Sequence, residues 1–180
     1  MKTSLRVLMA GLLLSLAGAP AGAADGVYAS PGPWVDDAEH VFELRSLAGS
    51  YTVVTMAYGA CQRVCSTTVR VLQSVHALAR ARQVPLRFVV FGLDPSQDTP
   101  ADWAAFRTQR GLVDAEFTFL AGPPSAVRQV AARLGVHYWR YGDHILHDFR
   151  VLLLSPDGTV LRSIDRFDED PALLLPPPAP

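Results

Sequence analysis

Residues 51–68 read "YTVVTMAYGACQRVCSTT" and decide the fold of this chain. The first half is a run of β-branched and apolar residues, which is typical of a strand buried on both faces at the centre of a sheet. The second half holds the only two cysteines, Cys61 and Cys65, and leads into a predicted helix. In parallel sheets, functional sites gather at the carboxyl ends of the strands, where these cysteines are expected to lie.

Strands and helices alternate after this stretch. Apolar residues at helical spacing predict a helix that runs from the cysteines and ends before Pro85. The last two strands are joined by the turn Pro156-Asp157-Gly158, a strong hairpin signal. The remaining predicted elements are a strand at 41–44, a strand at 86–94, a helix from Thr99-Pro100 to Gly111, a strand at 116–122, a helix at 123–136 and the hairpin at 149–165.

This alternation predicts an α/β fold in a thioredoxin-like arrangement, with a central mixed β-sheet flanked by helices and a C-terminal β-hairpin. A chain of 180 residues is long enough for one domain with a substantial core. We place that domain at 40–168. We expect an irregular lead-in segment at 25–39 and a loose, proline-rich tail at 169–180.

The first residues predict an export signal at 1–24. Lys2 and Arg6 precede an apolar run at 7–19, and small residues of the kind that a signal peptidase recognises follow it. The run is shorter than the roughly 20 residues that a membrane span needs. We therefore expect an exported protein of the bacterial periplasm, with an inner-membrane anchor only if the leader is retained. That compartment permits disulfides.

The charge pattern excludes two classes of partner. The formal net charge is −1, with 16 basic and 17 acidic side chains. There is no basic excess that would suggest nucleic acid and no polybasic stretch that would bind an anionic membrane. We expect no nucleic-acid partner, and contact with a membrane only through a retained leader.

The cysteine pair allows a structural disulfide, a redox pair or two metal ligands. A disulfide across so short a loop would stabilise the fold by only about 2 kcal/mol, which argues against a structural role in a domain that already has a core. At a helix N-terminus, unpaired N–H groups favour the thiolate, which is both the nucleophile and the soft metal ligand. Cys61 and Cys65 have three residues between them rather than the two of the common redox motif, so their sulfurs can open into a chelating pair.

From about residue 42 to 162, the chain resembles the Sco/SenC family of copper-binding, thioredoxin-like proteins. "CQRVCS" at 61–66 is similar to that family's Cys-Pro-Asp-Val-Cys-Pro, with both cysteines and the valine retained. "DPSQDTP" at 94–100 is similar to its Asp-Pro-x-x-Asp-Thr-Pro segment, and "VRQVAARLGVHYW" at 127–139 is close to the helix and extended stretch that follow. Gln62, Arg63 and Ser66 stand where the family has proline, aspartate and proline.

The resemblance implies that copper, as Cu(I) or Cu(II), is bound by Cys61, Cys65 and a histidine. The family's spacing back from the last hairpin points to His147, which we favour as a loop-borne ligand. His144 follows an aspartate, as the family's histidine does, and becomes the ligand if the register shifts by three residues. Thiolates favour Cu(I), and an added imidazole allows Cu(II). The same three side chains suit zinc.

The resemblance further implies a copper chaperone that serves the binuclear copper centre of cytochrome c oxidase. Its partner would be the copper-containing subunit of the oxidase or another copper carrier. The rival hypothesis is a thiol–disulfide oxidoreductase that uses Cys61 and Cys65 as its redox pair. A third hypothesis is a binding module without chemistry.

Overall fold

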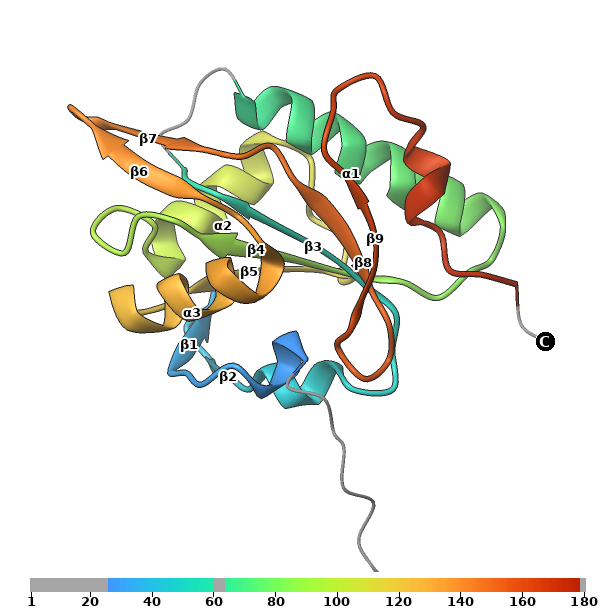
Figure 1. Cartoon of the computed structure of the whole chain (residues 1–180), viewed down its shortest axis with the longest axis horizontal. Coiled ribbons are helices and arrows are strands. Elements are labelled where there is room, and N and C mark those ends of the chain that lie inside the picture. Colours follow the sequence, from blue (N-terminus) through green and yellow to red (C-terminus); the bar gives the residue numbers. More distant parts are fainter. Residues whose placement is uncertain (1–25, 60–63, 179–180) are drawn as a thin grey trace, which may run out of the picture.

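Seven strands form the central sheet of the structure, a computed structural model that describes residues 26–59 and 64–178 (Figure 1). Their order across the sheet is β2-β1-β5-β4-β3-β8-β9. Their bounds are β1 (Trp34–Asp36), β2 (Val41–Phe42), β3 (Thr52–Ala57), β4 (Arg87–Gly92), β5 (Phe117–Ala121), β8 (Val151–Leu154) and β9 (Val160–Ile164).

The sheet is mixed, as the sequence predicts. β3, β4 and β5 are parallel to one another at its centre. β8 pairs antiparallel with β3, and β9 pairs antiparallel with β8, which confirms the predicted C-terminal hairpin. Every residue of β3 is buried, so its β-branched run is the centre of the core.

The three predicted helices are present as α1 (Val64–Ala81), α2 (Pro100–Gln109) and α3 (Pro124–Leu134). α2 starts at a capping box, in which Thr99 and Asp102 each accept a hydrogen bond from the other's backbone N–H. α3 ends at Gly135, whose left-handed backbone (φ 64°) favours glycine. Of the helices in the described part of the chain, none combines the length and apolarity that a membrane crossing requires.

The helices cover both faces of the sheet. His76 of α1 packs against Phe117 of β5, with ring centroids 5.0 Å apart, and Trp103 of α2 packs against Phe119 of the same strand. Phe117 and Phe119 are two residues apart on β5 and therefore share a face. α1 and α2 thus lie on one face, while Figure 1 shows α3 on the side of the sheet opposite α1.

Two end segments differ from the sequence prediction. The lead-in segment, expected to be irregular, contributes the 3-10 helix η1 (Val27–Ala29) and strand β1, because Trp34 inserts into the core. The tail forms a further 3-10 helix, η3 (Pro171–Leu174), because Leu174 and its neighbour Leu175 are buried. Its prolines exclude an α-helix but not this single turn. A third 3-10 helix, η2 (Leu44–Leu47), follows β2.

A two-stranded ribbon, β6 (Tyr138–Tyr141) and β7 (His144–His147), lies outside the central sheet. The sequence prediction treated this stretch as an extended segment followed by a loop, which is wrong. The turn at Gly142 (φ 58°) and Asp143 joins the two antiparallel strands. Both candidate histidines therefore lie on a strand and not on a loop. Figure 1 shows the ribbon projecting from the sheet near the end where α1 begins.

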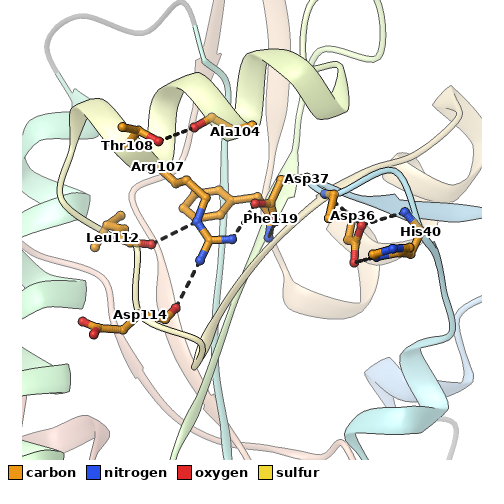
Figure 2. A network of polar contacts seen from close by, with 10 residues as sticks. Asp36, Asp37, His40, Ala104, Arg107, Thr108, Leu112, Asp114 and Phe119 are labelled. Atoms are coloured by element: carbon orange, nitrogen blue, oxygen red, sulfur yellow. Dashed lines mark hydrogen bonds and ion pairs between the residues drawn. The ribbon is translucent and has the colours of Figure 1, made fainter.

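An arginine network fastens the β1–β2 end of the sheet (Figure 2). Arg107 of α2 forms an ion pair with Asp37, which follows β1. Arg107 also donates hydrogen bonds to the carbonyl oxygens of Leu112 and Asp114, at 3.3 and 3.1 Å. The second oxygen of Asp37 accepts the N–H of Phe119 at 3.3 Å. One cation thus joins α2, the loop before β5 and the β1–β2 turn.

Candidate metal centre

The candidate centre lies at the carboxyl ends of β3 and β4. Tyr58 and Gly59 follow β3, and the chain then enters the cysteine segment. Cys65 lies in the first turn of α1, where the sequence analysis placed it. Cys61 lies outside the described residues.

His147 lies beside the strand end that leads into the cysteines. It is the last residue of β7, and its ring meets the ring of Tyr58 edge-on, with centroids 6.2 Å apart. Tyr58 precedes Cys61 by three residues. His144 is exposed at the other end of β7, opposite Tyr141 at the tip of the ribbon. Of the two candidate histidines, the structure therefore brings His147 to the end of β3, where the chain leads into the cysteine segment.

The two ring nitrogens of His147 have different surroundings. Nδ1 lies 2.8 Å from the carbonyl oxygen of Asp148. A carbonyl only accepts hydrogen bonds, so Nδ1 carries the proton and Nε2 of the neutral ring carries a lone pair. Nε2 is buried and has no hydrogen-bond partner among the described residues. A metal-binding histidine shows this pattern, with one nitrogen fixed by a carbonyl and the other free to coordinate.

Asp98 connects the ends of the two central strands. Its carboxylate accepts the backbone N–H of Gly59 and of Asp94, each at 2.7 Å. The side chain is buried, and this desolvation raises the pKa of Asp98 to about 6, although the backbone hydrogen bonds act in the opposite direction. Asp98 therefore fixes the start of the cysteine segment to the loop after β4.

Asp94 connects the same loop to the ribbon. One of its oxygens accepts hydrogen bonds from the backbone and the hydroxyl of Ser96. The other oxygen lies 3.0 Å from Nη2 of Arg140 on β6. Burial alone would raise the pKa of Asp94, but the Ser96 hydrogen bonds and the Arg140 guanidinium outweigh it and lower the pKa. Asp94 thus remains a carboxylate at neutral pH.

Sequence reasoning found the two aspartates only as part of a motif and did not single out Arg140. Within the described residues, no three His, Cys, Asp or Glu side chains gather closely enough to hold a metal ion. Cys61 is not among those residues. The motif "DPSQDTP" pointed to Asp94 and Asp98 but not to their partners, because Gly59 lies 39 residues from Asp98 and Arg140 lies 46 residues from Asp94.

The chain is similar to proteins of one family. The sequence model of the family SCO1/SenC matches residues 28–175. A relative described as "SCO1 protein homolog", from Bacillus subtilis (strain 168), is 23% identical over 132 residues, which cover 71% of this chain and 68% of that protein.

Solved structures agree with this match. The copper-bound ScoI of Arabidopsis thaliana superposes with a TM-score of 0.70 at 19% identity, covering 80% of this chain and 90% of that chain. BsSco, described as having a disulfide switch and as a member of the Sco family of cytochrome c oxidase assembly proteins, superposes with a TM-score of 0.66 at 20% identity. That match covers 76% of this chain and 81% of BsSco. The predicted thioredoxin-like α/β fold is confirmed.

Proposed function

The chain belongs to the SCO1/SenC family, and on that premise we propose that it binds copper and delivers it during assembly of the binuclear copper centre of cytochrome c oxidase. Two of the similar structures support this proposal, since one contains copper and the other is described as a cytochrome c oxidase assembly protein. The recipient would be the copper-containing subunit of the oxidase or another copper carrier.

The proposed ligands are Cys61, Cys65 and His147. The observation that supports this set is Nε2 of His147, which is buried, has no hydrogen-bond partner within 26–59 and 64–178, and belongs to a ring beside the strand end that leads to the cysteines. A buried acceptor without a partner is costly, and a metal ion would remove that cost. Two thiolates and an imidazole suit Cu(I), and they also admit Cu(II).

Delivery requires that a ligand can leave. His147 lies on a ribbon outside the central sheet, so a recipient's ligand can replace it without breaking a strand pairing of that sheet. Copper then passes by ligand exchange and keeps its oxidation state. If Cys61 and Cys65 are oxidised to a disulfide, they lose the thiolates that bind the metal. The redox state of the pair would thus control loading.

Export is part of the same proposal. Residues 1–24, which lie outside the described residues, would direct the chain to the periplasm, either as a cleaved signal or as an inner-membrane anchor. N-terminal sequencing of protein recovered from the periplasmic and membrane fractions distinguishes the two forms. A full-length chain in the cytoplasm would contradict both.

Anaerobic titration of the reduced protein with Cu(I) and with Cu(II) tests the proposed function. We expect one tight equivalent, which is lost in Cys61→Ala and in Cys65→Ala. His147→Ala should weaken binding and remove the imidazole signature from the Cu(II) spectrum, whereas His144→Ala, the matched control, should bind as the wild type does. Undiminished binding after loss of a cysteine would refute the ligand set.

A second function, thiol–disulfide exchange, is favoured by the place of Cys65 in the first turn of α1, where thiolates are stabilised. In that reaction one thiolate attacks a target disulfide and the second cysteine resolves the mixed disulfide, so two electrons pass to the target. Exchange requires the cysteines but not His147. A His147→Ala protein that keeps full reductase activity and loses copper would show that the two activities are separable.

A further inference from the structure

A continuous polar chain runs from the end of β3, where the chain leads into the cysteine segment, to the ribbon that carries His147. It begins at the N–H of Gly59, passes through the Asp98 carboxylate to the N–H of Asp94, and ends at the ion pair between Asp94 and Arg140. Two of its members, Asp94 and Asp98, are buried. The two segments that carry the proposed ligands are therefore both fastened to the single loop between β4 and α2.

The ribbon has one face toward the body and one toward solvent. Arg140 of β6 lies directly opposite Ile145 of β7 in the strand register, so their side chains are on the same face of the ribbon. His147 lies two residues farther along β7 and therefore shares that face. Ile145 is buried, whereas Trp139 and Leu146 on the other face are 53% and 43% exposed. Arg140 and His147 therefore point to the same side, toward the ends of β3 and β4.

We propose that Arg140 is a positioning residue of the metal centre: its ion pair with Asp94 orients the ribbon so that His147 stays beside Tyr58, at the end of β3, while Asp98 joins Gly59 to the same loop. This inference rests on the proposed function. In this proposal Arg140 does not contact the metal. The positioning role explains why a half-exposed arginine forms an ion pair with a buried carboxylate.

The ion pair is suited to orientation more than to stability. Arg140 is 52% exposed although Asp94 is only 5% exposed, and water screens an ion pair that has one solvent-exposed member, so we expect the pair to contribute little to the free energy of unfolding. A residue that orients a metal ligand has a larger effect on metal affinity, where loss of such a partner typically costs about 10-fold to 100-fold. The two quantities should therefore respond differently when Arg140 is removed.

A double-mutant cycle tests whether Arg140 acts through His147. Copper affinity is measured for wild type, Arg140→Ala, His147→Ala and the double variant, all reduced and full-length. We expect Arg140→Ala to weaken copper binding about 10-fold or more, and the double variant to bind no more weakly than His147→Ala alone. Arg140→Lys, which keeps the charge, should restore most of the affinity. Arg80→Ala is the matched control, because Arg80 is 63% exposed and pairs with Asp114 at the far end of α1.

A readout without copper completes the test. In metal-free Arg140→Ala, the amides of 138–147 should exchange with deuterium faster than in wild type, while those of β3 and β4 should not change. Asp94→Asn, which removes the charge from the other partner, should give the same result. If wild type takes up no copper, the proposed function fails and this inference fails with it. If wild type binds copper and Arg140→Ala binds it equally well, or if the two losses are additive, the inference alone is overturned.

Discussion

The protein has one arginine–aspartate pair at the β1–β2 edge of the central sheet and another at the β6–β7 ribbon, and the two arginines differ in exposure although both aspartate side chains are buried. At the β1–β2 end, Arg107 and Asp37, whose contacts Figure 2 shows, are 20% and 8% exposed, and β1 is itself hydrogen-bonded to β5. At the β6–β7 end, Arg140 is half-exposed, and the ribbon forms a sheet of its own. The same chemistry therefore serves stability in one place and, in our proposal, orientation in the other.

The difference follows from what each arginine satisfies. Arg107 meets two backbone carbonyl oxygens besides Asp37, so its removal would leave buried groups without partners. Arg140 meets the carboxylate of Asp94, which keeps the hydrogen bonds of Ser96 when the arginine is absent. Deleting the two cations should thus produce effects of different size and kind.

The largest effect is expected for Arg107→Ala. Asp37 is only 8% exposed, so removal of Arg107 leaves a buried charge uncompensated, and the loss of one partner from a buried pair typically costs about 3 to 5 kcal/mol. We expect the free energy of unfolding, measured by urea denaturation at neutral pH, to fall by that amount. Copper affinity of the folded protein should not change. Arg82→Ala, at an exposed arginine near the end of α1, is the control and should remain within about 0.5 kcal/mol of wild type.

An Arg107→Ala protein as stable as the control would show that the Arg107–Asp37 pair is not what stabilises this end of the sheet. A large loss would instead confirm that a network joining segments 70 residues apart acts as a structural fastening.

The sequence predicted some features of these regions and not others. The runs in β3, β4 and β5 and the helical periodicity of α1 predicted the core of the fold, because burial imposes those patterns locally. The capping residues before α2 and Gly135 after α3 were equally readable, since a cap satisfies neighbouring backbone groups. The pairing of Arg107 with Asp37 was not readable, because no local pattern specifies a partner so distant in the chain.

The β6–β7 ribbon was missed although a signal was present. Gly142-Asp143 is a dipeptide that favours a two-residue hairpin turn, and it stands between short stretches rich in aromatic and apolar residues. The charged and polar residues among them concealed the alternation. His147 was identified through the family resemblance, but the sequence could not show that its Nε2 is buried without a partner among the described residues, because this depends on the fold that brings the ring to Tyr58.

The next effect concerns Asp98 and pH. Its pKa is raised from 3.8 to about 6 in the folded protein, so between these values the folded state keeps a proton that the unfolded state has released. The contribution of Asp98 to the free energy of unfolding is therefore fully present below about pH 4 and is lost as the pH rises through about 6. The loss amounts to about 3 kcal/mol by pH 7, from about 2 pKa units.

Urea denaturation gives the free energy of unfolding of wild type and of Asp98→Asn at each pH from 4 to 7. The difference between the two pH profiles isolates the contribution of Asp98. The variant should lack the Asp98 slope. At neutral pH it also loses a backbone hydrogen bond, because an amide offers only one acceptor oxygen where Gly59 and Asp94 both donate an N–H. Parallel profiles for the two proteins would contradict the raised pKa.

A smaller effect is expected from Gly92→Ala at the end of β4. An added Cβ would lie 2.9 Å from Cβ of Asp98 and 3.2 Å from Nε1 of Trp103, both in the core. Overpacking of this kind typically costs about 1 to 3 kcal/mol. Gly59→Ala is the control, since its Cβ would meet the nearest Asp98 oxygen at an ordinary 3.5 Å. Equal thermal midpoints for the two variants would show that Asp98 can shift freely.

The smallest effect on the free energy of unfolding is expected for Arg140→Ala, and a small effect is what the positioning role requires. Arg140 is half-exposed, and the buried Asp94 keeps both hydrogen bonds from Ser96 when the arginine is absent, so we expect a loss of about 0 to 1 kcal/mol, as for an exposed pair, and a small shift of the urea midpoint. If unfolding free energy fell as far as in Arg107→Ala, the Arg140–Asp94 pair would be another structural fastening, and weaker copper binding would need no orientation of His147 to explain it. A stable variant whose ribbon amides exchange faster and whose copper affinity drops would instead separate the two roles, because only the position of the ribbon would have changed. Two measurements on Arg107→Ala and Arg140→Ala therefore distinguish a stabilising arginine from a positioning one: the free energy of unfolding and the deuterium exchange of the amides of 138–147.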